Sequence, residues 1–191
     1  MKILAVSDEE NNILWSDRIK EHVQGTELII SCGDLRSTYL EFLVTMLNIP
    51  LLYVHGNHDK SGPEGGICID GKIYCISGLS IMGLGGSMRY REGRNMYTER
   101  EMRIRIMKLF PFAMLKGIDI LVTHSPPKDY GDMQDLPHKG FDSFNFLLNF
   151  FTPSYMLHGH IHKSYGRIQT EHIHSSGTRI INVCGYRIIE V

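Results

Sequence analysis

The segment Gly56-Asn57-His58-Asp59 decides how this sequence is interpreted, because it follows directly on the apolar run of residues 50–55. That run, Pro-Leu-Leu-Tyr-Val-His, is short and apolar, which is typical of a strand buried on both faces. Gly56 allows the chain to turn tightly where the strand ends. A polar cluster at the end of a buried strand indicates a ligand site, because open α/β sheets bind ligands at the carboxyl ends of their strands.

Four more polar clusters follow short apolar runs in the same way. They are Asp8-Glu9-Glu10 after residues 2–7, Gly33-Asp34 after residues 27–32, His124 after residues 118–123, and His-Gly-His-Ile-His at residues 158–162. The segments 12–23 and 38–47 have helical character and lie between the first three runs. This order of strands and helices predicts parallel strands with right-handed crossovers, so we expect the five clusters to converge on one site.

The remainder of the chain adds strands and helices without a repeat or a linker. Residues 67–69 and 72–76 flank Asp70-Gly71, which predicts a two-residue hairpin. Residues 79–84 form another expected strand, and residues 98–115 and 141–151 are expected helices. We interpret residues 1–191 as one domain with two β-rich halves and helices outside them.

Composition excludes several classes of protein. The 191 residues carry a net charge of −1, which argues against general nucleic-acid binding. The longest apolar runs have the length of strands, so we expect no membrane span. The N-terminal apolar stretch is too short for an export signal, and the four cysteines show no framework spacing. We therefore expect a cytoplasmic protein with reduced cysteines.

The residue types in the five clusters are those that a pair of divalent metal ions needs. Carboxylates, imidazoles and a side-chain amide suit Mn²⁺, Fe or Zn²⁺. Strand alternation places Asp8 and Glu10 on one side of their segment, and it does the same for His160 and His162. Glu9 has the opposite parity and is expected to face solvent.

The order Asp-x-(His), Gly-Asp, Gly-Asn-His-Asp, a lone His and Gly-His-x-His resembles the signature of calcineurin-like metallophosphoesterases. The resemblance extends from residue 8 to residue 162. It implies an α/β fold, the four-layer α-β-β-α sandwich of two mixed sheets. It also implies two divalent metal ions: Asp8, Glu10 and His162 for the first, Asp34 as a bridge, and Asn57, His124 and His160 for the second.

The resemblance further implies dinuclear-metal-dependent hydrolysis of a phosphate ester by a metal-bridging hydroxide. His58 would be the catalytic histidine, and Asp59 would orient it. Mn²⁺ is the expected ion, with Fe, Zn, Ni and Co as alternatives. The small single-domain branch of the family favours a small phosphodiester over a phosphomonoester as substrate, and a homodimer is an additional possibility.

Position 10 departs from the family pattern, because most relatives have His where this chain has Glu10. A ligating Glu10 would lower the net charge of the centre and favour a harder ion. Alternatively, Glu10 points away and the first metal position is weak. The second alternative leads to another class of protein, a catalytically weakened or inactive scaffold for protein interactions, which would have no reason to retain His58.

Three residues are candidates for binding substrate. Arg89 and Arg91 follow the glycine-rich turn at residues 85–87, from which they could grip a phosphate group. His138 lies in the loop of residues 132–140 and could face the substrate. The alternative for the basic segment that continues into residues 100–108 is a solvated helix face with i,i+4 ion pairs.

Overall fold

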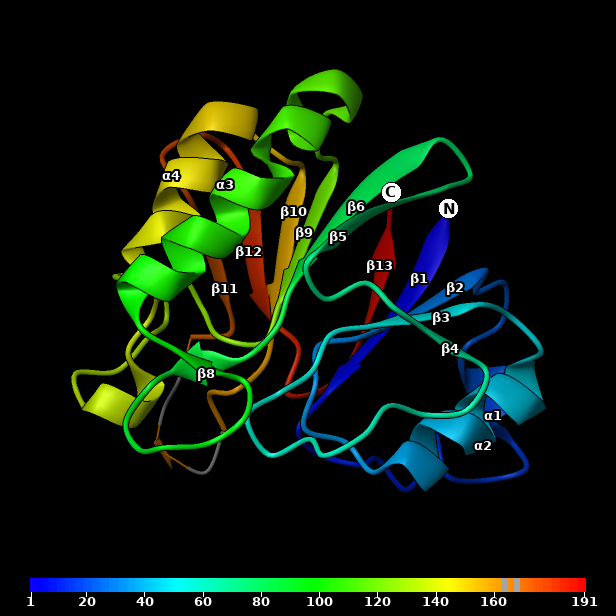
Figure 1. The fold of residues 1–191 in the computed structure, drawn as a ribbon. Helices are drawn as coiled ribbons and strands as arrows, with labels where there is room; N and C mark the ends of the chain where they lie inside the picture. Colours follow the sequence, from blue (N-terminus) through cyan, green and yellow to red (C-terminus); the bar gives the residue numbers. More distant parts are fainter. Residues whose placement is uncertain (163–164, 167–168) are drawn as a thin grey trace.

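The computed structural model describes residues 1–162, 165–166 and 169–191, and most of its strands form two large sheets (Figure 1). The first sheet has the order β13 (Gly185–Glu190), β1 (Lys2–Ser7), β2 (Leu28–Ser31), β3 (Leu51–Tyr53) and β4 (Gly66–Cys68). The strands β1 to β4 are parallel, and β13 runs antiparallel to β1. The parallel order predicted for the first three strands is confirmed.

The second sheet has a parallel centre and antiparallel edges. Its order is β11 (Glu171–Ile173), β12 (Arg179–Asn182), β10 (Tyr155–His158), β9 (Ile120–Thr123), β6 (Leu79–Leu84) and β5 (Lys72–Ile76). The four central strands are parallel, whereas β11 and β5 are antiparallel to their neighbours. A short third sheet pairs β7 (Ser87–Met88) with β8 (Met96–Tyr97).

Helices cover the outer face of each large sheet (Figure 1). The helices α1 (Ile19–His22) and α2 (Ser37–Leu47) lie against the first sheet, and α3 (Glu99–Lys116) and α4 (Asp142–Phe151) lie against the second. A 3₁₀ turn, η1, spans Leu136–His138. Among the described residues, no helix combines the length and the apolar character that crossing a bilayer requires.

The apolar residues alternate along the strands and so form three buried layers. In β1, Ile3 and Ala5 face the second sheet, whereas Leu4 and Val6 face α1 and α2. In β9, Val122 likewise faces the space between the sheets. This alternation buries both faces of each sheet and confirms the four-layer α-β-β-α sandwich.

The hairpin predicted at Asp70-Gly71 is wrong. Residues 66–68 form β4, which joins the first sheet, whereas Lys72–Ile76 form β5 in the second sheet. The true hairpin joins β5 to β6 through Ser77 and Gly78, which both have positive φ angles of 48° and 84°. Asp70-Gly71 is therefore the point at which the chain passes from one sheet to the other.

The helix predicted over residues 12–23 is reduced to the single turn Ile19–His22. Residues before it form turns, in which Asn11 Oδ1 accepts a hydrogen bond from the backbone N–H of Ile13. Asparagine side chains compete in this way with helical hydrogen bonds. The other predicted helices are present, and Thr98 and Glu101 form a capping box at the start of α3.

Candidate metal centre

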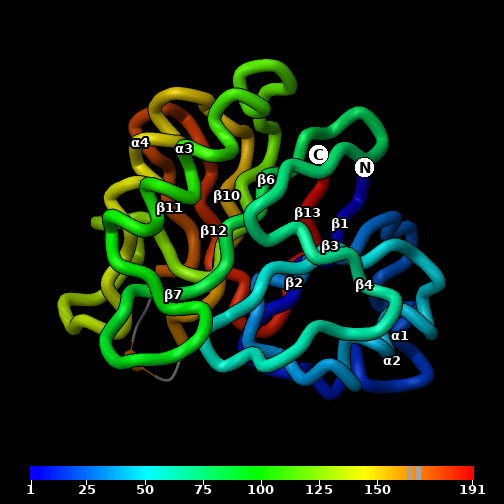
Figure 2. Tube along the Cα trace, viewed as in Figure 1, coloured from blue at the N-terminus to red at the C-terminus, as the bar shows by residue number. Residues whose placement is uncertain are grey.

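The predicted polar clusters converge at the carboxyl edges of the two large sheets. Figure 2 shows that segments following strands of both sheets come together at the lower centre of the molecule. Hydrogen bonds join the two halves there: His124 Nδ1 lies 2.8 Å from the carbonyl oxygen of Cys32, and the His160 N–H donates to Asp8 Oδ2 at 2.9 Å. The expectation of one shared site is therefore met by these residues.

One group of ligand-type side chains comprises Asp34, His124 and His160, whose donor atoms all lie within 4.8 Å of one another. His124 Nε2 is 3.3 Å from Asp34 Oδ2 and 3.0 Å from Asn57 Oδ1. These four residues are the set predicted for the second metal ion. They come from four different strand ends, so the fold of both sheets is needed to assemble them.

Hydrogen bonds to the backbone determine which imidazole nitrogens face this group. A carbonyl oxygen can only accept, so His124 Nδ1 donates to Cys32 and leaves Nε2 facing Asp34 and Asn57. In the same way, His160 Nε2 donates a hydrogen bond to the carbonyl oxygen of Pro137 at 2.8 Å. Nδ1 of His160 is therefore the nitrogen that does not bind this carbonyl oxygen. Metal-binding histidines are oriented by such bonds from the second ring nitrogen.

The charges in this group are strongly coupled. Burial disfavours the ionised form of Asp34, but the charge and hydrogen bond of His124 outweigh it and lower the pKa of Asp34 to about 2. Burial also disfavours a charged His124, but Asp34 outweighs it and raises the pKa of His124 to about 9. Burial together with the charge of His124 lowers the pKa of His160 to about 3.

Asp8 and His162 lie together beside this group. The Asp8 side chain is fully buried, and its Oδ1 is 3.7 Å from His162 Nε2. Among the described residues, Asp8 Oδ1 has no hydrogen-bond partner, and burial raises the pKa of Asp8. A buried carboxylate oxygen of this kind is unfavourable unless a cation or a donor meets it.

Glu10 does not join Asp8 and His162, contrary to the first of the two alternatives for this residue. Both of its carboxylate oxygens pair with the guanidinium of Arg36. The parity argument failed because β1 ends at Ser7 and Asp8 has a φ of 60°, which turns the chain out of the strand. Glu9 is exposed, as expected, and its Oε1 lies 3.6 Å from His162 Nδ1.

His58 and Asp59 lie at the rim of the site. The backbone N–H of His58 donates a hydrogen bond to Asp34 Oδ1 at 2.8 Å. His58 is exposed and lines the pocket described in the next paragraph. Asp59, predicted to orient His58, has another role, because its Oδ2 accepts hydrogen bonds from the N–H groups of Gly56 and Asp34 at 2.8 and 3.0 Å. Asp59 therefore fixes the two loops that carry Asp34 and Asn57.

A pocket of about 440 Å³ opens beside His58, and its charged lining consists of three basic residues and the acidic residues Asp59 and Glu92. Arg91, predicted as a substrate ligand, lines this pocket together with Lys60 and Arg94. Arg89 does not, because its guanidinium binds Glu101 and the carbonyl oxygen of Met96. Lys60 and Arg94 were missed by sequence reasoning, which considered only the arginines next to the glycine-rich turn.

His138 faces the metal-ligand group. Its ring centroid is 5.2 Å from that of His160, and its Nδ1 is 2.6 Å from Asp135 Oδ2. The loop of residues 132–140 thus brings His138 beside His160, and its contact with a substrate stays a prediction.

Cys184 is a further residue that the sequence analysis overlooked. Its sulfur, the carboxylate of Glu9 and an imidazole nitrogen of His162 lie within 4.8 Å of one another. The signal was present in the sequence, because Cys184 follows the apolar run of β12 just as the other clusters follow their strands. No disulfide involves any of the four cysteines, all of which lie in the described part of the chain.

Comparisons with known proteins identify the family of this chain. The model of the calcineurin-like phosphoesterase superfamily domain matches residues 1–185. The UPF0046 protein T07D4.2 of Caenorhabditis elegans is 33% identical over 70 residues, which are 36% of this chain and only 16% of that protein. That local match leaves most of the relative's length without a counterpart here.

Solved structures share the fold at low sequence identity. The protein TT1561 of Thermus thermophilus superimposes with a TM-score of 0.68 at 16% identity, over 96% of this chain and 89% of its own. A single mutant of Vps29 from Entamoeba histolytica gives a TM-score of 0.52 at 13% identity, over 100% and 86% of the two chains. At such identities these likenesses describe the fold alone. The family match over residues 1–185 shows that the chain belongs to the calcineurin-like phosphoesterase superfamily.

Proposed function

We propose that this protein hydrolyses a small phosphate ester, with a phosphodiester preferred, at a site that holds two divalent metal ions. The observation that carries the proposal is the group of Asp34, His124 and His160, whose donor atoms lie within 4.8 Å of one another around Asn57 Oδ1. A mixed set of carboxylate, amide and imidazole ligands is suited to ions such as Mn²⁺ or Fe²⁺.

The residues present fit a metal centre. The Asp34 carboxylate lies 3.3 Å from His124 Nε2, and Asp8 Oδ1 is buried without a hydrogen-bond partner among the described residues. Gly56 and Gly159 keep the space around these carboxylates open, since a Cβ atom would lie 2.0 Å from Asp34 Oδ1 at Gly56 and 2.2 Å from Asp8 Oδ2 at Gly159. Two buried carboxylates with imidazoles beside them provide the negative charge that divalent ions require.

Asp34, Asn57, His124 and His160 would hold one ion, for which Mn²⁺ is the proposed metal. Asp8 and His162 border the position of the other ion. When bound, such ions supply Lewis acidity, which lowers the pKa of coordinated water and balances negative charge on a phosphoryl group. The chain itself supplies the orientation of the ligands, through Asp59 and the backbone carbonyls of Cys32 and Pro137.

The residues beside the metal ligands would bind and process the ester. Lys60, Arg91 and Arg94 outnumber the two acidic residues of the pocket, Asp59 and Glu92, and would attract a phosphate group. His58 lines that pocket, its backbone N–H binds Asp34 Oδ1, and its imidazole is the group we propose to protonate the leaving oxygen. The pocket volume of about 440 Å³ accommodates a small molecule and leaves room for the second ester group of a diester.

The ion pair of Glu10 with Arg36 favours a second candidate, a catalytically weakened scaffold for protein interaction. Arg36 holds the residue at position 10 away from the first metal position, and a vacant first position would impair hydrolysis. The retained His58 favours the enzyme, because a scaffold has no need of an imidazole beside the pocket.

The experiment compares bis-p-nitrophenyl phosphate with p-nitrophenyl phosphate. Metal-stripped protein reloaded with Mn²⁺ should hydrolyse both, with the larger kcat/KM for the diester. His58→Ala should lower kcat by about 100-fold, since general acid catalysis contributes factors of this order. A larger kcat/KM for the monoester would contradict the diester preference, and no turnover with two ions bound would favour the scaffold.

Two arginine variants test the contribution of the pocket separately from that of the metal ions. Arg91→Gln should raise KM and leave metal binding unchanged, because Arg91 lines the pocket and is not a ligand. Arg89→Gln should have little effect on KM, because Arg89 binds Glu101 instead.

A further inference from the structure

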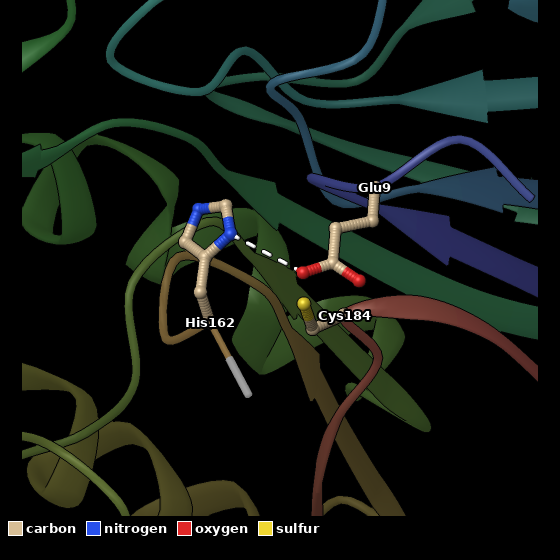
Figure 3. Close-up of side chains that lie close together, drawn as sticks. All are labelled: Glu9, His162 and Cys184. Carbon is tan, nitrogen blue, oxygen red and sulfur yellow. Dashed lines mark ion pairs between the residues drawn. The ribbon is translucent and has the colours of Figure 1, made fainter. Parts of the chain in front are cut away.

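We propose that Glu9, His162 and Cys184 hold the first metal ion of this protein, so that the position contains a cysteine thiolate and favours a softer ion such as Zn²⁺ or Fe²⁺ over Mn²⁺. Figure 3 shows the sulfur of Cys184 and the imidazole of His162 both directed toward the carboxylate of Glu9. The inference rests on the proposed function, because it completes the first of the two positions described there.

The three donor atoms are close enough to bind one ion after small side-chain movements. They lie within 4.8 Å of one another. In a tetrahedral site with Zn–N near 2.0 Å and Zn–S near 2.3 Å, ligand atoms are separated by about 3.3 to 3.8 Å. Glu9 is exposed and therefore free to rotate toward the ion, whereas Cys184 is fully buried and supplies a fixed donor.

The structure holds Cys184 and the histidine segment together through Asn182. This buried side chain accepts a hydrogen bond from the Cys184 N–H at 3.1 Å and donates one to the carbonyl oxygen of Ile161 at 2.8 Å. Asn182 thus links the residue before His162 to Cys184. A side-chain clamp between two donors preorganises them, which is the usual function of residues behind a metal ligand.

His162 is placed between two carboxylates, one on each ring nitrogen. Nδ1 is 3.6 Å from Glu9 Oε1, and Nε2 is 3.7 Å from Asp8 Oδ1. An ion on the side of Glu9 and Cys184 binds Nδ1 and leaves the Nε2 hydrogen for Asp8. Asp8 Oδ1, which lacks a hydrogen-bond partner among the described residues, lies 3.7 Å from Nε2 and would accept this hydrogen after a small side-chain movement, as in other carboxylate–histidine–metal arrangements.

The ligand set determines the ion. A thiol that coordinates a divalent metal loses its proton to solvent, and the resulting thiolate binds Zn²⁺ or Fe²⁺ more strongly than Mn²⁺. The second position, formed by Asp34, Asn57, His124 and His160, has only oxygen and nitrogen donors. The chain therefore offers two positions with different metal preferences, and Glu10 belongs to neither.

Cobalt reports on this ligand set independently of activity. Metal-free, full-length protein loaded with Co²⁺ should show an intense thiolate-to-Co²⁺ charge-transfer band in the near ultraviolet. Cys184→Ser should abolish the band and remove one of two bound equivalents of Co²⁺. Cys75→Ser is the matched control, because Cys75 is exposed on β5, and it should retain the band.

Adjacent glutamates provide a second pair of variants that does not disturb the buried cysteine. Glu9→Gln should weaken Co²⁺ binding at the position with the band by about 10-fold, the scale on which ligand-shell changes act. Glu10→Gln should leave both the band and the affinity unchanged, because Glu10 binds Arg36.

Two results would overturn the inference. If two equivalents of Co²⁺ bind to the wild-type protein without a charge-transfer band, Cys184 is not a ligand, while the proposed hydrolysis remains possible. If the affinity falls in Glu10→Gln and not in Glu9→Gln, the first position uses Glu10. Absence of any Co²⁺ binding would instead remove the proposed function together with this inference.

Discussion

At the scale of single residues, the metal centre depends on backbone conformations that most side chains avoid. Asp8, Asp34 and His160 have φ angles of 60°, 56° and 68°. Non-glycine residues with such angles lose about 1 kcal/mol or more each, and they persist where the surrounding structure enforces them. Here each of the three turns the chain sharply after a buried strand and directs a ligand-type side chain into the site.

Gly159 offers the most direct test of this close packing. A Cβ atom there would lie 1.9 Å from Ser7 Oγ and 2.2 Å from Asp8 Oδ2. Gly159→Ala should therefore displace Asp8, lower the free energy of unfolding by about 1 to 3 kcal/mol and weaken metal binding at least 10-fold. Isothermal titration with Mn²⁺ and urea denaturation measure the two effects.

Gly78→Ala is the control for this variant. Gly78 has a φ of 84°, and a Cβ atom added there would meet nothing within 4 Å, so alanine adds backbone strain far from the site. It should reduce stability and leave metal affinity unchanged. Equal metal affinity in Gly159→Ala and the wild type would contradict the close-packing argument.

Variants of Asp59 test whether this residue anchors two loops or orients His58. Its Oδ2 accepts two backbone N–H groups, so Asp59→Ala should lower the free energy of unfolding by about 1 to 3 kcal/mol. Asp59→Asn keeps an acceptor oxygen, so it should reduce the free energy of unfolding and kcat less than Asp59→Ala does. A large loss of kcat in Asp59→Asn without any loss of stability would instead favour the role predicted from the sequence.

At the scale of elements, Asp70 joins the segment between the sheets to α3. It forms an ion pair with Arg105 of α3 and accepts a hydrogen bond from the Gly85 N–H at 2.7 Å. Burial opposes its ionisation, but His55 and Arg105 outweigh it and lower the pKa of Asp70. The side chains of Asp70 and Arg105 are only 12% and 18% exposed, so the pair is poorly screened by solvent.

This lowered pKa gives a pH dependence of defined sign. The contribution of Asp70 to stability is complete above the unfolded pKa of about 3.9 and is lost as the pH falls through the lower, folded pKa. Asp70→Asn should therefore reduce the free energy of unfolding by about 3 kcal/mol near pH 7, and the difference from wild type should shrink below about pH 4. Urea denaturation across this range measures it, and a difference that grew toward low pH would contradict the assignment.

Elements that have a clear apolar pattern and do not depend on distant partners could be predicted from the sequence. The strands before Asp8, Asp34 and Asn57 are buried on both faces and were identified by their apolar runs. The hairpin at Asp70-Gly71 was wrong because its turn signal is local, whereas the choice of sheet for β4 and β5 depends on distant partners. A two-residue turn signal cannot indicate that the chain changes sheets.

The candidate site likewise contains residues whose positions could be predicted and residues whose positions could not. Asp34, Asn57, His124 and His160 could be predicted because their order along the chain matches a family pattern, and the structure brings them together. Cys184 follows a strand as the other clusters do, but its proximity to Glu9 and His162 could not be predicted, because it depends on the left-handed turn at Asp8 and on the hydrogen bonds of Asn182. Such a turn ends the strand alternation on which the argument from parity depends.

At the scale of the whole molecule, the site is built where two sheets meet, so metal binding should stabilise the complete sandwich. A ligand present at 100 times its Kd adds about 2.7 kcal/mol to the free energy of unfolding. Addition of Mn²⁺ to metal-free protein should accordingly raise Tm by several degrees. His124→Ala should abolish most of this rise, and an equal rise in that variant would show that the ion binds elsewhere.

The most direct test of the central claim is a titration of metal-free protein with Mn²⁺ while hydrolysis of bis-p-nitrophenyl phosphate is measured. The account predicts no turnover without metal, turnover that saturates as two ions bind, and loss of turnover in His124→Ala, whose side chain lies at the centre of the ligand group. Two bound ions without turnover of this ester or of the monoester would contradict the account and favour a scaffold built on a phosphoesterase fold.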